Sequence, residues 1–405
     1  MTRISENRGI TLLALIVTII VLLILSGISI AMLTGDNGIY DNAVTANRAT
    51  RAGEVKERVA LEVSNNQILK YTNRTEKTRD EVIAELQAEG KLTAEEVAEL
   101  GAAETPVITI GGITIDFSVL PEKVQTWTQD GTSVTDGEIT LTVGQAVSGY
   151  EVEGYESLNW CVLGAKDGKL LITTSANTET IELSGKDGYT GGVETLNTAA
   201  AKYSDGDLAD SVRTIDVDDI NRVTGYDPAT AGYGSGNVGE YGNQVTYTKK
   251  TDGKIWYQGS KQPTTQTTSS YTSFEYWNGT NWISLGEEES ATLTSTSYWY
   301  SPNTLTTSDS GETNGIATDS DAYTLLFANT GGKGQEDKAI WLGSPCVDCF
   351  EGRADFGLRY VMDGYVNNGY LYYSDGNTYS GTYGLRPAVS LKSNVKVTSA
   401  GVVSK

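Results

Sequence analysis

The sequence predicts an α+β protein in three successive parts: a long N-terminal hydrophobic helix, a small α+β region and a larger, mainly-β domain. Three observations support this order. Residues 10–33 form an uncharged apolar run, residues 69–128 combine helical and β patterns, and residues 129–405 contain short β-like runs separated by turn residues. The length of 405 residues allows two or three domains with sizeable cores.

Composition excludes several classes of function. The formal charge of −22 argues against a nucleic-acid partner, because phosphate recognition needs clustered Lys and Arg side chains. The absence of histidine removes the commonest general base and most zinc sites, and three cysteines cannot fill a four-thiolate site. Glycine (45 residues) and tyrosine (23 residues) are abundant, which is typical of turn-rich β proteins at surfaces. We therefore expect no enzyme, no cofactor and no metal site.

The first element is the apolar run at residues 10–33. As a helix it would extend about 36 Å, enough to cross a hydrocarbon core of about 30 Å. The run is longer than the apolar region of a secretory signal, and no small-x-small cleavage site follows it. Because Arg3 and Arg8 precede the run, the positive-inside rule predicts a single-pass protein of the cell membrane with an extracellular C-terminal region.

The junction before this run, RGITLL at positions 8–13, resembles a type IV prepilin cleavage motif, with a short charged leader at residues 1–9. The resemblance implies cleavage after Gly9 by a prepilin peptidase and methylation of the new amino terminus on Ile10. It also implies a transmembrane and stem helix at residues 10–68, with the membrane and other pilin-like subunits of a surface filament as partners. The sequence departs from most pilins at Ala14, where they carry glutamate, so a main filament subunit is not implied. A plain membrane anchor is the alternative.

The next elements predict a small α+β, pilin-like region at residues 69–128. Two capping boxes, Thr78 with Glu81 and Thr93 with Glu96, predict short helices near 79–89 and 94–101. Two β-like runs flank Gly111-Gly112 and predict a β-hairpin over residues 106–117.

Residues 129–405 are predicted to form one domain with long surface insertions. Residues 138–143, 160–164 and 169–173 are its clearest strands, and a Lys-Asp-Gly turn predicts that the last two form a hairpin. Helices are expected at 193–202 and, behind an Asp216 cap, at 217–223. Residues 276–282 predict a tight turn between strands within a polar insertion at 228–315.

The end of this domain resembles a C-type-lectin-like fold, of the branch that formylglycine-generating enzymes share with the variable proteins of diversity-generating retroelements. The motifs that carry the resemblance are AIWLGSP at 339–345, FGLRYV at 356–361 and YGLRPAVSL at 383–391. The resemblance implies a ligand-binding domain at residues 129–405, with a role in adhesion or recognition.

Residues 364–383, between the two Gly-Leu-Arg motifs, form the candidate binding face. Six of these twenty residues are tyrosine, and most others are Gly, Asn, Ser, Thr or Asp, as in antibody paratopes. In the retroelement-diversified relatives the variable residues occupy this position, so the resemblance implies an unknown extracellular protein or glycan as ligand. Whether the segment is actively diversified stays open, and an ordinary β-meander with packed tyrosines is the alternative. The candidate ligand-binding residues are Tyr365, Asn367, Asn368, Tyr370, Tyr372, Tyr373, Ser374, Asp375, Asn377 and Tyr379.

Cysteines support one alternative function, a membrane-tethered copper-dependent oxidase of the formylglycine-generating type. Cys346 and Cys349 form the only metal-like or redox-like pair, but their spacing and surroundings do not match that family well. A local disulfide or two incidental thiols are favoured, and the redox state of Cys161 is equally open. A further alternative is a structural minor pilin without a ligand.

Other charged residues are expected to be structural. Asp216, Asp218 and Asp219 lack the spacing of a calcium loop, so helix capping is favoured over Ca²⁺ binding. Arg359 and Arg386 are candidates for a carboxylate ligand, but the resembled fold uses equivalent arginines structurally.

Overall fold

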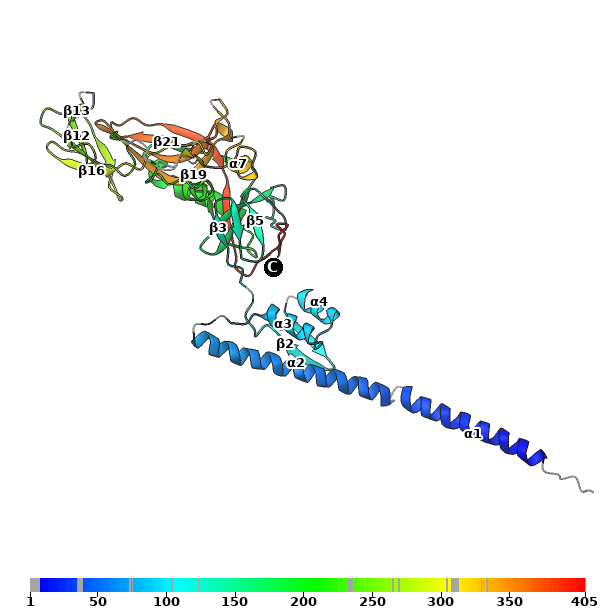
Figure 1. Ribbon diagram of the computed structural model, residues 1–405. Helices are drawn as coiled ribbons and strands as arrows, with labels where there is room; N and C mark the ends of the chain where they lie inside the picture. The colour runs from blue at the N-terminus through cyan, green and yellow to red at the C-terminus, as the bar shows by residue number, and fades with distance from the viewer. Residues whose placement is uncertain are drawn as a thin grey trace, which may run out of the picture. The chain divides into compact units, whose positions relative to one another are not determined.

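The computed structural model divides the chain into two compact units, Met1–Lys123 and Val124–Lys405 (Figure 1). It describes residues 8–404 apart from 35–38, 73, 75, 103–104, 123, 232–235, 264–265, 269, 304, 307–312, 329 and 333. The division lies five residues before the boundary expected between residues 128 and 129.

Unit 1 (Met1–Lys123) consists of helices followed by a β-hairpin. Its elements are α1 (Arg8–Thr34), α2 (Ile39–Tyr71), α3 (Arg79–Ala88), α4 (Ala94–Ala102), β1 (Val107–Ile110) and β2 (Ile113–Asp116). The predicted capping box of α3 is confirmed, because Thr78 accepts from the backbone N–H of Glu81 while the Glu81 carboxylate accepts from the backbone N–H of Thr78. The predicted hairpin is confirmed too.

One apolar face of α2 forms the core of unit 1. Ala52, Val55 and Val59 are buried there against α3, α4 and the hairpin. The guanidinium of Arg51 on α2 donates to both carboxylate oxygens of Glu96 on α4, at 2.8 and 2.7 Å. Because α2 is polar elsewhere, its apolar stripe determines which face the rest of the unit covers.

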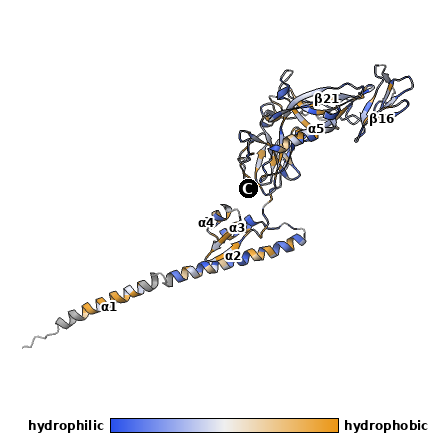
Figure 2. Ribbon diagram, turned by 180° about the vertical axis from the view of Figure 1, so that it is seen from behind, coloured by the Kyte–Doolittle hydropathy of each residue, from blue (hydrophilic) through white to orange (hydrophobic). Residues whose placement is uncertain are grey.

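The prediction of a long N-terminal hydrophobic helix is wrong. The predicted α+β class is wrong as well, because the chain is mixed α/β. Helix α1 ends at Thr34 and α2 begins at Ile39, so the predicted transmembrane and stem helix corresponds to two helices. Figure 2 shows apolar residues along α1 and a mostly polar α2.

The predicted membrane location is corrected as well. Within the described residues, no helix combines the length and the apolarity needed to cross a membrane. The single-pass location in the cell membrane, with an extracellular C-terminal region, is therefore not supported.

Unit 2 (Val124–Lys405) is built around two five-stranded sheets, β10-β23-β8-β7-β6 and β21-β20-β19-β22-β9. The strands of the first are β6 (Ala146–Val147), β7 (Trp160–Lys166), β8 (Lys169–Thr174), β10 (Ala209–Thr214) and β23 (Pro387–Leu391). Those of the second are β9 (Glu179–Ser184), β19 (Ile340–Phe350), β20 (Arg353–Met362), β21 (Tyr365–Tyr373) and β22 (Ser380–Leu385). Both sheets contribute to one hydrophobic core, in which Trp341 is fully buried.

Helices α5 (Gly185–Ala200), α6 (Val217–Thr224) and α7 (Asp321–Leu326), with short 3-10 turns at Ala201–Tyr203 and Glu336–Lys338, complete this core region. Helix α6 has the predicted Asp216 cap, which is confirmed as a capping box with Asp219. Helix α5 begins eight residues before the predicted start at 193. Glycines in this first part of α5 let the helix pack closely on the second sheet. A Cβ on Gly188 or Gly192 would lie only 3.1 Å from leucine side chains of β21 or β9.

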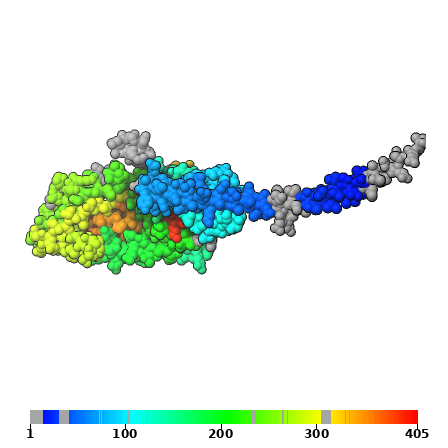
Figure 3. Space-filling model, turned by 90° about the horizontal axis from the view of Figure 1, so that it is seen from below, coloured from blue at the N-terminus to red at the C-terminus, as the bar shows by residue number. Residues whose placement is uncertain are grey.

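The segment expected to be a surface insertion forms a sheet of its own. This sheet has the order β13-β12-β11-β16, from β11 (Gln244–Lys249), β12 (Ile255–Gly259), β13 (Gln266–Thr268) and β16 (Ser290–Thr294). The predicted turn at 276–282 is confirmed by the hairpin of β14 (Glu275–Trp277) and β15 (Trp282–Ser284). Tyr247 and Phe274 pack with Phe356 of β20 in a further core. Figure 3 shows this segment (yellow-green) beside the C-terminal strands (orange).

Smaller elements complete unit 2. These are β3 (Thr128–Asp130), β4 (Ser133–Thr135) and β5 (Thr140–Thr142) in one sheet, and the pairs β17 (Leu305–Thr306) with β18 (Thr313–Asn314) and β24 (Lys396–Val397) with β25 (Val403–Ser404).

Candidate functional site

The candidate binding face follows β21, the outermost strand of the second sheet, and the turn after it. The candidate residues fall into three groups by their exposure. Tyr365, Asn377 and Tyr379 are exposed; Asn367, Tyr370, Tyr373 and Asp375 are half-buried; and Asn368, Tyr372 and Ser374 are buried. The structure therefore places only part of the predicted set at the surface.

Two of the buried residues connect β21 to its neighbours. Tyr372 packs its ring 4.7 Å from that of Trp282 and donates its hydroxyl proton to Glu275 at 2.6 Å. The hydroxyl of Ser374 accepts from the backbone N–H of Ala354 on β20 at 2.9 Å. The hydroxyls of both residues are thus bonded inside the protein. These two side chains therefore stabilise the fold and are not available to a ligand.

Asn368, the third buried residue, belongs to a buried polar network. Its amide oxygen accepts from Arg359 at 2.9 Å, and its amide nitrogen donates to Ser297 at 2.8 Å. Ser297 donates to Asp348 at 3.0 Å, and the hydroxyl of Tyr370 donates to the same carboxylate oxygen at 2.6 Å. The network thus extends from a buried guanidinium to a tyrosine at the surface.

Residues 296–300, which we call the crossing segment, pass over β20 and supply part of this network. Thr296 bonds the backbone of Val347 on β19 in both directions, at 2.8 Å each. At the other end, Tyr300 pairs with Val366 of β21 in an isolated antiparallel bridge. Between them, Arg359 of β20 donates to the carbonyl oxygens of Thr296 and Tyr298. Arg359 is therefore a structural residue, as expected.

Beyond the crossing segment, side chains on the same face of the sheet form what we call the aromatic patch: Phe350, Arg353, Tyr370, Tyr373 and Tyr379. The guanidinium of Arg353 lies 4.2 Å from the ring centre of Tyr373 and 5.5 Å from that of Phe350. The rings of Tyr373 and Tyr379 are 4.4 Å apart. Phe350 is 39 % exposed and Tyr379 is 45 % exposed, so the patch offers aromatic surface to a ligand.

Two buried carboxylates lie beneath the patch. Asp348 and Asp355 are directly opposite each other on β19 and β20, so their side chains lie on the same face. Burial raises the pKa of Asp348, although hydrogen bonds from Tyr370 and Ser297 act in the other direction. Burial raises the pKa of Asp355 to about 7, and the charge of Arg353 opposes that rise.

Arg353 holds Asp355 through one hydrogen bond, from Nη2 to Oδ2 at 3.1 Å. Its Nε also lies 2.8 Å from Oδ1, but the alignment is not that of a hydrogen bond, and neither of these buried atoms has a hydrogen-bond partner among the residues that the structure describes. The position of the Arg353 guanidinium is thus fixed by the carboxylate of Asp355 and by the rings of Tyr373 and Phe350.

Local sequence patterns missed Phe350 and Arg353, although one signal was present. They face each other across the Glu351-Gly352 turn between β19 and β20, where Gly352 has a φ of 74°. An X-Gly pair between two β-like runs is a hairpin signal, and it would have placed both side chains beside the candidate segment. The crossing segment carries no comparable signal.

Tyr365 lies at the opposite end of β21 from the aromatic patch. Its ring is 6.0 Å from that of Trp299, which is 52 % exposed. The candidate residues therefore do not form one continuous site. Tyr365 with Trp299 is a separate exposed pair.

Cys346 and Cys349 do not form a pair. They are free, buried and three residues apart on β19, so their side chains point to opposite faces of the sheet. Burial raises the pKa of Cys346 to about 11 and that of Cys349 to about 12, so both thiols stay protonated near neutral pH. Cys161 is also a free, buried thiol. The arrangement does not support copper binding by Cys346 and Cys349.

The remaining candidate positions are accounted for individually. Arg386 is buried, donates to Asn177 and to the carbonyl of Leu325, and burial lowers its pKa to about 10. Asp219 caps α6 and accepts from two arginines, and no cluster suited to a metal ion occurs among the described residues. Gly9 and Ile10 lie in the first turn of α1, and the leader before residue 8 lies outside the described residues. Cleavage after Gly9 stays a prediction.

Comparison of the chain with protein-family models, with curated proteins and with solved structures gave no match. The resemblances to type IV pilins and to the C-type-lectin-like fold stay predictions.

Proposed function

We propose that unit 2 is a recognition domain that binds a protein ligand through the aromatic patch. The observation that carries this proposal is the combination of exposed and fixed aromatic groups. Phe350 and Tyr379 present ring surface, while Arg353 and Tyr370 are anchored to the buried carboxylates Asp355 and Asp348. Side chains that are ordered before binding lose less conformational entropy when a ligand arrives.

The composition of the patch favours a protein over a glycan. Tyr, Phe and Arg are enriched at the centres of protein interfaces, and Tyr and Arg often carry most of the binding energy. Phe350 adds exposed apolar area without a hydrogen-bonding group, and the Arg353 guanidinium is already stacked on Tyr373. A sugar would need more free polar partners than these residues offer.

The test is a screen of the purified full chain against arrayed purified proteins and arrayed glycans. We expect protein ligands whose affinity falls about 30-fold, equal to about 2 kcal/mol, in Phe350→Ala and in Tyr379→Ala. Trp299→Ala is the matched control, because this exposed aromatic side chain lies outside the patch and should leave the affinity unchanged.

The tryptophan fluorescence of each variant shows whether folding is preserved, since all seven tryptophans lie in unit 2. Ligands that bind both patch variants as tightly as the wild type would refute the proposal. Binding confined to glycans would replace the protein ligand with a sugar.

A further inference from the structure

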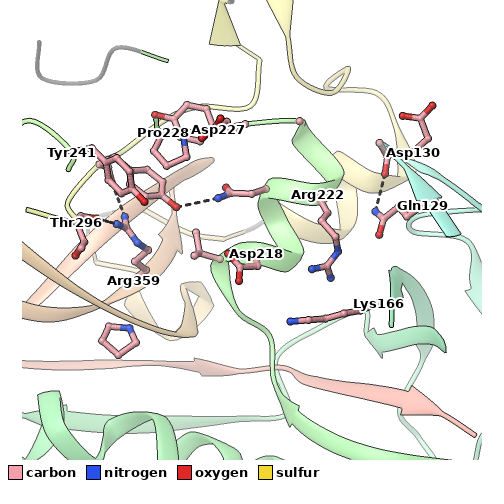
Figure 4. A pocket seen from close by; sticks show the side chains of 17 residues that line it. Gln129, Asp130, Lys166, Asp218, Arg222, Asp227, Pro228, Tyr241, Thr296 and Arg359 are labelled. Atoms are coloured by element: carbon pink, nitrogen blue, oxygen red, sulfur yellow. Dashed lines mark hydrogen bonds between the residues drawn. The ribbon is translucent and has the colours of Figure 1, made fainter. Parts of the chain in front are cut away.

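A cavity of about 850 Å³ lies in unit 2, away from the aromatic patch (Figure 4). Its walls come from α6, from residues 129–131 at β3, from the end of β7 and from the crossing segment. This volume is within the range of about 300–1,000 Å³ that is typical of small-molecule sites. We call it the tyrosine pocket, and it does not depend on the proposed function of the patch.

One wall of the pocket is aromatic. Tyr226 and Tyr298 have ring centres 5.4 Å apart, and Tyr241 meets Tyr298 edge-on at 5.5 Å. The rings are held from behind, because Tyr226 stacks on Tyr300 at 3.9 Å and Asn221 donates to the hydroxyl of Tyr298 at 3.1 Å. A flat ligand would meet a surface that is already ordered.

Lys166 and Arg222 reach into the pocket from β7 and α6 (Figure 4). Arg222 donates to Asp219 at 2.6 Å through Nη2, but its buried Nε has no hydrogen-bond partner among the described residues. The ammonium of Lys166 is 3.9 Å from its nearest ion-pair partner, Asp216. Nη1 of Arg222 makes no hydrogen bond within the described residues, so this nitrogen and the ammonium of Lys166 have donors left for a ligand.

Carboxylates line the same space and restrict the charge of the ligand. Asp130, Asp218 and Asp227 face it together with Lys166, Arg222 and Arg359. In the view of Figure 4, Asp218 lies between Arg359 and the pair of Lys166 and Arg222. Asp218 makes no hydrogen bond or ion pair within the described part of the chain. A simple anion would be repelled by the carboxylates, and a simple cation by the basic groups.

We propose that the tyrosine pocket binds a small zwitterion with an aromatic ring, of which a free aromatic amino acid is the simplest example. The ligand carboxylate binds Lys166 and Nη1 of Arg222. The ligand ammonium binds Asp218. Its ring packs against Tyr226 and Tyr241, which are only half-buried and line the pocket, and offset or edge-on stacking there adds specificity.

Calorimetric titration of the full chain tests this with three probes: L-tryptophan, tryptamine, which lacks the carboxylate, and indole-3-propionate, which lacks the ammonium group. We expect L-tryptophan to bind at least about tenfold more tightly than either analogue, because each analogue leaves one charged group of the pocket without its partner.

Two variants assign the charges. Lys166→Met should weaken L-tryptophan about tenfold and leave tryptamine unchanged, whereas Asp218→Asn should weaken L-tryptophan and leave indole-3-propionate unchanged. The matched controls are Lys169→Met and Asp210→Asn, which break an ion pair of 2.7 Å outside the pocket and should change no affinity. Tryptophan fluorescence during urea unfolding shows that each variant folds.

Three results would overturn the proposal. The first is an absence of binding by L-tryptophan, L-tyrosine and L-phenylalanine. The second is an affinity for tryptamine or indole-3-propionate equal to that for L-tryptophan. The third is wild-type affinity in both Lys166→Met and Asp218→Asn.

Discussion

The hydroxyl of Tyr370 is bonded to Asp348, a carboxylate that is only 7 % exposed. Tyr370→Phe keeps the ring but removes one of the two hydrogen bonds that this buried oxygen accepts. Leaving a buried acceptor less satisfied typically costs about 1–3 kcal/mol. We expect the free energy of unfolding of unit 2 to fall by this amount, as measured by urea unfolding with tryptophan fluorescence.

The control for this change is Tyr365→Phe, at a residue that is 39 % exposed. It removes the same hydroxyl from the same strand and should alter stability by less than about 0.5 kcal/mol. Equal urea midpoints for Tyr370→Phe and the wild type would show that the bond to Asp348 contributes nothing.

Asp355 makes the stability of unit 2 depend on pH in an unusual direction. Its pKa is about 7 in the folded state, because of burial, whereas an unfolded aspartate has a pKa of about 3.9. Between these values the folded state binds the proton more tightly than the unfolded state. This group therefore lowers the free energy of unfolding as pH rises from about 4 to about 7, by up to roughly 1.4 kcal/mol per pH unit.

The variant Asp355→Asn isolates this effect from the other carboxylates, since an amide does not titrate. The free energy of unfolding of the wild type minus that of the variant should decrease as pH rises from about 4 to about 7, and should then level off. A difference that is constant over this range, measured by urea unfolding at several pH values, contradicts the raised pKa.

At the scale of the element, β21 and the turn after it contain both residues that hold the fold and residues that can bind a ligand. Tyr372 is 3 % exposed and packs on Trp282, so Tyr372→Ala should cost about 3–5 kcal/mol of stability. Tyr379 follows the strand and is 45 % exposed, so Tyr379→Ala should cost less than about 1 kcal/mol. Thermal unfolding compares the two, and similar losses would show that the candidate face is part of the core.

The two Gly-Leu-Arg motifs perform the same structural task. In each, the leucine is buried and the arginine donates to backbone carbonyl oxygens of a separate segment. Arg359→Lys removes the planar group that bonds Thr296, Tyr298 and Asn368 together.

We expect this substitution to destabilise unit 2 by about 1–3 kcal/mol and to loosen the crossing segment, because buried acceptors lose hydrogen bonds. Hydrogen exchange should accelerate at the amides of Thr296 and Val366, while the amides that pair β24 with β25 provide the internal control. Unchanged exchange at both positions would show that Arg359 does not hold the segment.

Local chemistry made part of these elements predictable. Thr78, Thr93 and Asp216 each cap a helix that the sequence predicts, because capping depends on neighbours three residues away. The start of α5 was not predictable in this way, since its glycines disfavour a helix until close packing on leucines compensates.

The candidate site was only partly predictable for the same reason. The tyrosines of 364–383 were visible as a composition, but their burial follows from the pleat and from partners far away in the chain. Asn368 bonds Ser297, 71 residues earlier, and no local pattern encodes such a contact.

At the scale of the whole molecule, each unit has hydrophobic clusters of its own. The cluster around Val55 and Phe117 belongs to unit 1, whereas those around Trp341 and Tyr247 belong to unit 2. A unit with its own core is expected to fold alone. A fragment of residues 124–405 should therefore unfold at the same urea midpoint as unit 2 in the full chain, as followed by tryptophan fluorescence. A clearly lower midpoint would show that unit 1 stabilises unit 2.

The division of residues 364–383 into buried and exposed positions also limits how this gene can change from one generation to the next. Codons for Asn368, Tyr372 and Ser374 specify groups that neighbouring strands and the crossing segment depend on, so most mutations there would remove the protein altogether. Codons for Tyr365, Asn377 and Tyr379 specify side chains in solvent. Sequence variation in this segment would therefore be tolerated at the exposed positions and not at the buried ones. Variants that arise in this way would differ in their binding surface and keep the same fold.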